Sequence, residues 1–424
     1  MSVCIENLAK GVQGYYIQNN RFNTTLLTYN FYIPLESENM AANALLPYLL
    51  TSCSDRYRDF IDLNVRLLEL YGADLSCSAI KCGDYFRIKF GISVINSELS
   101  FDGTDPVSDA AELINGLLFA PAVKDGRFYD NDLAREKRKT IERIEGEINN
   151  KRSFARTRLM EEMFGNDPYG KFSYGTVEEV EAIDSAQLHE MWRKLLSTAY
   201  LRVVVVGKEY PKKVFEQAKE SFSGIMRDDV VGMDRFVAIP EADEVKTVTE
   251  RIDVNQGKLA MGFTAGMHGN LKTTAALSLF TDMFGGGPYS KLFENVREKQ
   301  SLCYYCSASS RRSKGFITVE SGVEEANADK TISAVLKELS DMQNGCFEDK
   351  LIDAAKKSII DSLQGCNDSA TAMDQWYTRE LGDFISFEEA AEIISKITRD
   401  EIIEAAKGVK LHTVYKLLPM EGEE

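Results

Sequence analysis

The order of the expected secondary-structure elements repeats in the two halves of the chain, and this repeat constrains the fold more than any other feature. Apolar and β-branched patterns in the first half predict a strand, a helix, a second strand, further helices and a buried final strand. Their approximate ranges are 24–35, 59–71, 84–94, 130–164, 177–196 and 201–206. The second half gives a comparable order, with strands at 258–265, 302–309 and 315–321, helices at 273–284 and up to 299, and helices over most of 325–407. The pattern predicts a duplicated unit of strands and helices.

Two short stretches support the duplication at the level of residues. Leu70–Ala79 (LYGADLSCSA) resembles Lys299–Ala308 (KQSLCYYCSA) at an offset of 229 residues. Ile183–Leu188 resembles Ile397–Ile402 at an offset of 214. Matches of this length also arise by chance, so they support the repeated order of elements and do not replace it.

The length of the chain points to the same organisation. A single core rarely grows beyond about 250 to 300 residues, whereas this chain has 424. We predict two α+β domains of similar topology, residues 1–227 and 245–424, each a sheet with helices packed mainly on one face. Residues 228–244, acidic and poorly periodic, are the predicted linker.

Charge and composition exclude several classes of protein. Sixty-six acidic against fifty basic residues give a net charge of −16, which repels phosphate backbones and argues against nucleic-acid binding. The eight cysteines are spread along the chain, which favours a reducing compartment over a disulfide scaffold. No stretch approaches the roughly 20 apolar residues of a membrane span, and residues 1–10 lack the pattern of a signal peptide. We expect a cytoplasmic protein that does not enter membranes.

The residues usual in catalysis and metal binding form no strong motif. Cys303-Tyr-Tyr-Cys306 is a C-x-x-C without a second pair at zinc-ribbon spacing. In a strand its two thiols are predicted to point to opposite faces, which favours two packed cysteines, with redox or metal chemistry as the alternative. The three histidines, His189, His268 and His412, do not have the i, i+4 spacing of a metal-binding helix.

Two further stretches could bind a ligand, one a peptide and the other an anionic partner. The segment Phe284–Ser290 is rich in glycine but lacks the ending of a P-loop, so a helix-breaking turn or a peptide-contacting loop is expected. Between Arg135 and Arg158, nine bases alternate with acids. Mixed charges at helical spacing favour a solvated helix face, and a site for an anionic partner is the alternative.

Residues Gly285–Ser309 (GGGPYSKLFENVREKQSLCYYCSAS) closely resemble the C-terminal half of M16 (pitrilysin/insulinase-type) zinc peptidases. Asp167–Gly175 (DPYGKFSYG) resembles the N-terminal half of the same family. The resemblance implies two homologous domains of the M16 type, also called LuxS/MPP-like. It further implies that Arg297 and Tyr304, seven residues apart, contact the substrate backbone together with the glycine turn of Gly285, Gly286 and Gly287.

The family's catalytic motif, H-x-x-E-H, is replaced in this chain. By comparison with the family it falls on Ala44-Leu-Leu-Pro47-Tyr48, and the third zinc ligand falls on Arg143, or on Glu142 if the register shifts by one. Zinc needs neutral imidazole or anionic ligands, which alanine, tyrosine and arginine do not provide. We therefore expect no metal in this chain and no peptidase activity of the chain alone.

The resemblance implies a shared active site. In heterodimeric M16 peptidases a degenerate subunit provides the Arg/Tyr pair and a catalytic homologue carries H-x-x-E-H and the zinc. This chain resembles the degenerate subunit, and it also resembles the bacterial M16-like proteins named for association with elongation factor P modification. The expected partners are a zinc-bearing homologue and a peptide substrate, with a homodimer possible in isolation. A scaffolding pseudoenzyme is the main alternative, and an independent enzyme using Cys303 or Cys306 is a third.

Overall fold

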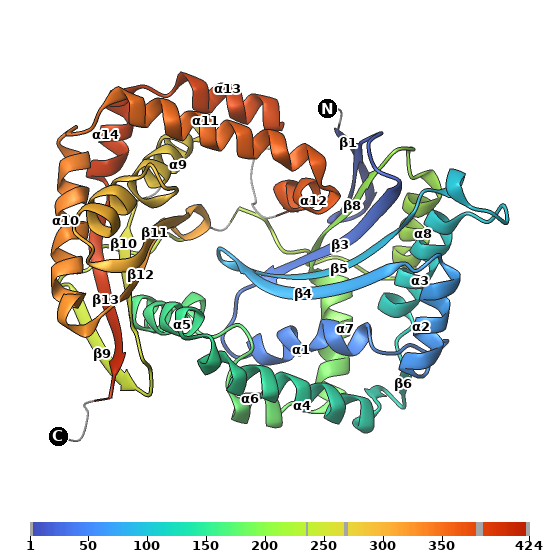
Figure 1. Cartoon of the computed structure of the whole chain (residues 1–424). Coiled ribbons are helices and arrows are strands. Elements are labelled where there is room, and N and C mark those ends of the chain that lie inside the picture. Colours follow the sequence, from blue (N-terminus) through green and yellow to red (C-terminus); the bar gives the residue numbers. More distant parts are fainter. Residues whose placement is uncertain (1–2, 235, 267–269, 379–384, 421–424) are drawn as a thin grey trace. The chain divides into compact units, whose positions relative to one another are not determined.

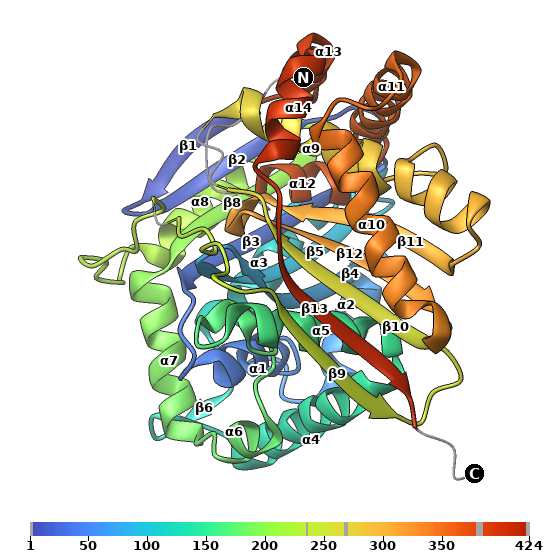
Figure 2. The ribbon, with the colours of Figure 1, turned by 90° about the vertical axis from the view of Figure 1, so that its left-hand side faces the viewer.

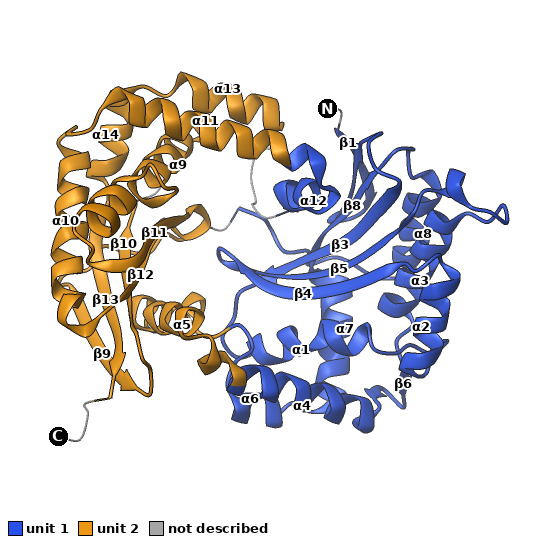
Figure 3. Ribbon diagram, in the orientation of Figure 1, with its two compact units in different colours: residues 1–145, 173–235, 366–384 blue, residues 146–172, 236–365, 385–424 orange. Residues whose placement is uncertain are grey.

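The structure, a computed structural model, describes residues 3–234, 236–266, 270–378 and 385–420 (Figure 1). The chain forms two compact units, each assembled from three separate segments (Figure 3). Unit 1 consists of residues 1–145, 173–235 and 366–384, and unit 2 of residues 146–172, 236–365 and 385–424.

Unit 1 is built on a six-stranded sheet with the order β1-β2-β8-β3-β5-β4. Its strands are β1 Val3–Ala9, β2 Val12–Gln18, β3 Thr24–Pro34, β4 Asp74–Cys82, β5 Tyr85–Ile95 and β8 Tyr200–Gly207. Neighbouring strands are antiparallel except β2 and β8, which run parallel. A short hairpin, β6 Val123–Lys124 and β7 Arg127–Phe128, stands apart from this sheet.

The helices of unit 1 cover mainly one face of this sheet. They are α1 Met40–Leu50, α2 Phe60–Glu69, α3 Pro106–Phe119, α4 Asp130–Gly146, α6 Val177–Glu181, α7 Ser185–Thr198, α8 Lys212–Phe222 and α12 Ala370–Thr378. Successive residues of a strand point to opposite faces. Tyr29 of β3 donates a hydrogen bond to Asn115 of α3, whereas Thr28 donates to Asp374 of α12. In Figure 1, α12 accordingly lies on the opposite side of the sheet from α1 and α7.

Unit 2 contains a five-stranded sheet with the order β11-β12-β10-β13-β9. Its strands are β9 Lys246–Ile252, β10 Gly257–Thr264, β11 Cys303–Arg311, β12 Phe316–Val323 and β13 Lys410–Pro419. The parallel pair is β9 and β13 (side by side in Figure 2), and all other neighbours are antiparallel. This order matches β4-β5-β3-β8-β2 of unit 1 strand for strand, with the parallel pair in the same place. The predicted duplication is confirmed, and β1 is an addition to unit 1.

The helices of unit 2 also cover mainly one face of their sheet. They are α5 Lys151–Phe164, α9 Leu271–Gly285, α10 Ala328–Gln343, α11 Asp349–Gly365, α13 Phe387–Lys396 and α14 Arg399–Lys407. A large apolar core joins Met261 and Phe263 of β10 to all of these helices except α5. On the other face, Leu159 of α5 packs against Ala260 and Tyr415. Each sheet therefore has one heavily covered face and one face that meets a single helix.

The helix that packs alone on one face of each sheet, α12 in unit 1 and α5 in unit 2, comes from the half of the sequence that forms most of the other unit. Helix α5 belongs to unit 2 although it precedes the last strand of unit 1, and α12 belongs to unit 1 although it precedes the last strand of unit 2. The segment 130–164, expected to be helical, contains two helices. The first, α4, ends at Gly146, and Asn150 caps α5 by accepting a hydrogen bond from the backbone N–H of Ser153.

The two sequence matches fall at equivalent places in the units. Leu70–Ala79 joins the end of α2 to the edge strand β4, and Lys299–Ala308 joins a helical segment to the edge strand β11. Ile183–Leu188 spans the junction of α6 and α7, which precede β8, and Ile397–Ile402 spans the junction of α13 and α14, which precede β13. Asp184 and Thr398 are the N-caps at these junctions. Between α8 and β9 the described residues form no helix or strand. Because each unit draws on both halves of the sequence, domain boundaries at 227 and 245 stay a prediction.

Across the described ranges, no helix combines the length and the apolar character that crossing a membrane requires.

Candidate functional site

Helix α1 carries Ala44, Pro47 and Tyr48, the three positions on which the family's catalytic motif was expected to fall. Ala44 is completely buried, and Pro47 is also buried inside the helix. Tyr48 is the only one of the three that is half-exposed. The two buried positions therefore contribute to the core of unit 1, and only Tyr48 reaches the surface.

Arg143 of α4 meets Tyr48 at this surface. Its guanidinium carbon lies 4.5 Å from the centroid of the Tyr48 ring and 4.8 Å from that of Tyr174. The two phenol oxygens are hydrogen-bonded at 3.1 Å. Glu142 is exposed and lies 3.9 Å from Arg138, a charge pair within α4. The structure thus brings together Tyr48 and Arg143, not Glu142, and adds Tyr174.

Tyr174 was missed as a site residue, although it lies in the DPYGKFSYG segment. The next residue, Gly175, has a φ of +70°, and a Cβ there would lie 2.8 Å from the Cβ of Ala41 in α1. The chain can therefore approach α1 this closely only with glycine. After it, Thr176 and Glu179 form a capping box that starts α6. These contacts hold Tyr174 against α1.

Electrostatics in this cluster do not favour a metal. Burial is the main cause that raises the pKa of Tyr48, the hydrogen bond to Tyr174 adds to it, and Arg143 opposes it. The nearby thiol of Cys77, 3.3 Å from the Thr51 hydroxyl, also has its pKa raised by burial. No three His, Cys, Asp or Glu side chains in the described part of the chain group as a metal would require. A guanidinium and neutral phenols do not fit Zn²⁺, which binds imidazole, thiolate and carboxylate.

Arg297 and Tyr304 lie on either side of the turn into β11. Arg297 belongs to a π-helical segment, Leu292–Lys299, a rare form of helix that is frequent at functional sites. Its guanidinium lies 4.6 Å from the centroid of Phe293 and 3.3 Å from Glu298. Tyr304 is 56% exposed and donates a hydrogen bond of 3.1 Å to Glu324. Both side chains reach solvent, and no hydrogen bond joins them among the described contacts.

A β-bulge in β11 determines where Tyr304 points. Cys303 and Tyr305 pair with the adjacent residues Val323 and Gly322, so Tyr304 is an extra residue in the ladder. The extra residue shifts the alternation of side chains by one position. As a result, Cys303 and Cys306 both face the core of unit 2. The expectation that the two thiols point to opposite faces was therefore wrong. A regular strand would have separated them, and the bulge has no clear signal in the sequence.

The glycine turn follows α9. Gly285 is buried, and a Cβ there would lie 2.5 Å from the backbone nitrogen of Ala308 in β11, so this glycine permits close packing. Gly286 is exposed and Gly287 is half-exposed. Beside them, Tyr289 donates a hydrogen bond to Asp282, and burial raises the pKa of the Tyr289 hydroxyl to about 12. Gly286 and Gly287 are therefore the parts of the turn that a ligand could reach.

Cys303 is expected to react as a thiolate near neutral pH. A hydrogen bond from Cys306 is the main cause that lowers the pKa of Cys303 to about 7, and burial opposes it. Alkylation by iodoacetamide should therefore be slow below pH 7, where the thiol is protonated, and reach half its limiting rate near pH 7. Cys306→Ala removes the donor and should move this midpoint upward, whereas Cys306→Ser should largely retain it. The exposed Cys346 serves as the internal reference for the reagent, and an unchanged midpoint in Cys306→Ala would contradict the assignment.

Comparisons with known proteins agree with this fold. Residues 182–359 match the family model described as the peptidase M16 inactive domain. A Bacillus subtilis protein described as a probable inactive metalloprotease, YmfF, is 28% identical over 414 residues, covering 97% of each chain. The crystal structure of a conserved protein from Enterococcus faecalis V583 is 26% identical, with a TM-score of 0.90 over the full length of both chains.

A more distant structure shares the fold alone. The peptidase M16 inactive domain from Pseudomonas fluorescens is 17% identical, with a TM-score of 0.81 over all of both chains. The same two-unit architecture is therefore present where little of the sequence is shared. Together with the strand order of the two sheets, these matches show that the chain is M16-like in sequence and in fold.

Proposed function

We propose that this chain is the non-catalytic subunit of a heterodimeric M16 peptidase, acting in the cytoplasm on peptides. In this proposal a homologous partner carries H-x-x-E-H and the zinc. The observation that carries it is a contrast within the molecule. The positions expected to hold zinc are replaced by Ala44, Tyr48 and Arg143, whereas Arg297 and Tyr304 remain accessible to solvent.

The retained pair has the chemistry that peptide hydrolysis requires. A guanidinium and a phenol both donate hydrogen bonds, and donors aimed at a carbonyl oxygen stabilise the negative charge that develops there in the transition state. Tyr304 belongs to the edge strand β11, Arg297 to the helical segment that leads into this strand, and Gly285 of the glycine turn packs against Ala308 of the same strand. A peptide bound along this part of unit 2 would therefore meet both donors.

The second candidate function is a scaffolding M16-like protein with no role in proteolysis. The hydrogen bond from Tyr304 to Glu324 favours it. This bond occupies the phenol proton and raises the pKa of Tyr304. In the peptidase proposal, substrate has to displace Glu324 as the acceptor. In the scaffold alternative no substrate displaces Glu324, and the bond between Tyr304 and Glu324 is a permanent surface contact.

The experiment that tests the proposal compares the isolated chain with the assembled complex. The isolated chain, dialysed and examined by elemental analysis, should contain no stoichiometric zinc and should cleave no member of a peptide library. Copurification from the native host should recover an H-x-x-E-H homologue, and peptidase activity should require both chains. One tightly bound zinc per isolated chain, with activity lost on chelation, would show that the zinc site was misplaced. A partner whose activity is independent of this chain would favour the scaffold alternative.

A further inference from the structure

The other bases of α4 each have a carboxylate or a backbone carbonyl as partner, and Arg143 differs from them. Arg135 is 3.0 Å from Asp132, Lys139 is 2.9 Å from Glu136, and Arg138 is paired with Glu142. Lys137 donates to the backbone carbonyl of Glu181. Among the described residues, no carboxylate lies within ion-pair distance of Arg143, and its recorded neighbours are the two tyrosine rings. An exposed cation is thus held in place by aromatic contacts alone.

The two rings fix the position of this guanidinium. Cation–π contacts with Tyr48 and Tyr174 use the charge of the guanidinium and leave its N–H groups to form hydrogen bonds with a ligand. The hydrogen bond between the two phenol oxygens and the close approach of Gly175 to α1 hold both rings in position. A side chain held in this way loses less conformational entropy when it binds a ligand than a free surface arginine does.

We propose that Tyr48, Arg143 and Tyr174 form a binding site for a carboxylate, provided by the C-terminus or by an acidic side chain of a peptide. The edge of a guanidinium matches the two oxygens of a carboxylate in a bidentate arrangement. The net charge of −16 on the chain disfavours non-specific attraction of anions, so binding would depend on these contacts. The family resemblance places zinc ligands at these positions. The proposed site would therefore bind an anion where the catalytic members of the family bind a cation.

The choice of a peptide as the carrier rests on the proposed function, but the carboxylate site does not. The experiment therefore uses the isolated full-length chain and needs no partner. Three fluorescein-labelled decapeptides are compared by anisotropy. The first lacks Asp and Glu and has a free C-terminus, the second is its C-terminal amide, and the third is the amide with one glutamate. Tighter binding of the first identifies a terminal carboxylate, and tighter binding of the third identifies a side-chain carboxylate.

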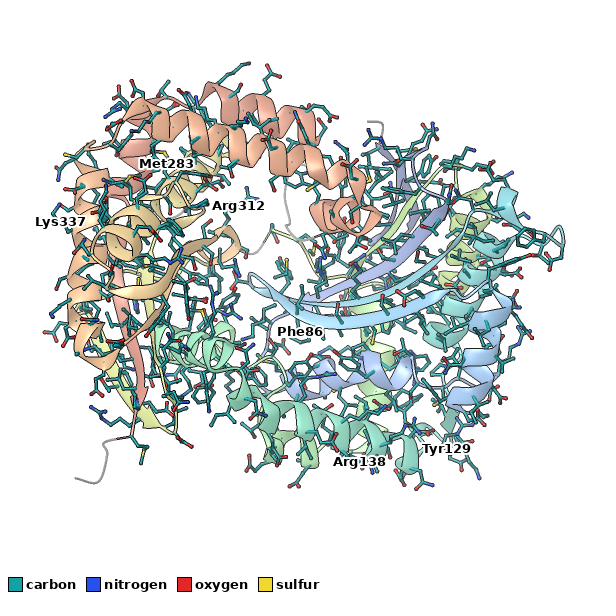
Figure 4. The ribbon with its side chains drawn as sticks, viewed as in Figure 1. Phe86, Tyr129, Arg138, Met283, Arg312 and Lys337 are labelled. Atoms are coloured by element: carbon teal, nitrogen blue, oxygen red, sulfur yellow. The ribbon has the colours of Figure 1, made fainter. Side chains whose placement is uncertain are left out.

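Arg143→Gln should weaken binding of the carboxylate peptide by about 10-fold or more, as expected for loss of a hydrogen bond to a charged group. Its affinity for the neutral amide should not change. Arg143→Lys should restore binding only in part because an ammonium cannot form the bidentate contact. Arg138→Gln is the matched control, since Arg138 is one turn away on α4, labelled in Figure 4, and its side chain is 74% exposed. It should bind like wild type.

A second measurement reports on the residue itself. Phenylglyoxal modifies exposed arginines, and acetate should slow its reaction with Arg143 but not with Arg138, as read by peptide mass spectrometry. The inference is wrong if neither carboxylate peptide binds more tightly than the neutral amide, if Arg143→Gln and Arg138→Gln have equal effects, or if acetate gives no protection. None of these outcomes depends on whether a catalytic partner exists, so failure of this inference and failure of the proposed function are separable.

Discussion

Tyr304→Phe is expected to lower the turnover of the assembled peptidase complex by about 10²-fold, the effect of removing one donor to a developing oxyanion. The substitution removes only the phenol oxygen. Tyr304 is 56% exposed, and its one recorded hydrogen bond is to Glu324 at the surface. Folding and partner binding should therefore be unaffected. The measurement is kcat for complexes of the zinc-bearing partner with wild-type and variant chains at saturating peptide.

Two variants close by are controls for this prediction. Tyr305→Phe removes a hydroxyl from the next residue of β11, whose ring packs against Arg152 of α5, and should leave kcat unchanged. Arg297→Ala should lower kcat at least as much as Tyr304→Phe, with some loss of packing against Phe293. Arg311→Ala, at the exposed far end of β11, should have no effect. Unchanged turnover in both Tyr304→Phe and Arg297→Ala would assign the chain to the scaffold class.

Asp374→Ala is expected to destabilise unit 1 by about 3–5 kcal/mol, as found when one partner of a buried ion pair is removed. Asp374 of α12 is completely buried, and its carboxylate accepts hydrogen bonds of 2.5 Å from Thr28 and from Lys89. Without it, the ammonium of Lys89, on the sheet face that α12 covers, has lost its counter-charge. The free energy of unfolding, measured by urea titration, should fall accordingly, and hydrogen exchange should accelerate in β3 and β5.

An exposed ion pair nearby provides the control. Arg21 and Asp368 are also 2.5 Å apart, but their side chains are 66% and 72% exposed. Asp368→Ala should therefore cost less than about 1 kcal/mol. The double variant Lys89→Met, Asp374→Leu should be more stable than Asp374→Ala because it removes both charges of the pair and leaves neither one buried without its partner. If the two aspartate variants lost equal stability, the buried pair would not be what holds α12 on the sheet.

Much of the fold was predictable because its signals are local. The strands at β3, β5, β8, β10 and β12 are apolar or β-branched runs. The edge strands β4 and β9 are more polar and were not predicted as separate strands. The exchange of α5 and α12 was not predictable, since the destination of a helix depends on contacts with strands more than 100 residues away. Asp374 and Lys89, for example, are separated by 285 positions.

The candidate site was predictable in its composition but not in its geometry. Family resemblance placed Arg143 and Tyr48 at related positions, and the structure shows that their side chains touch. The role of Tyr174 depends on a loop that Gly175 allows to approach α1, a contact between segments distant in sequence. The orientation of Tyr304 depends on a bulge of one residue. Such an insertion in the hydrogen-bond ladder leaves the composition of the strand unchanged.

The exchange of helices has a consequence for the order in which the units can be completed during synthesis. Helix α5 is synthesised before any strand of unit 2. Its apolar residues Ala155 and Leu159 therefore cannot pack against their sheet until those strands have been synthesised. Unit 1 has all its strands once β8 has emerged, but it lacks α12 until nearly the whole chain has been translated. The sheet face that waits carries Thr28, Lys89 and other polar side chains, which water can solvate in the interval. Because the sheet face that α12 covers is polar, its exposure before α12 is synthesised should cause less aggregation of the growing chain than an apolar face would.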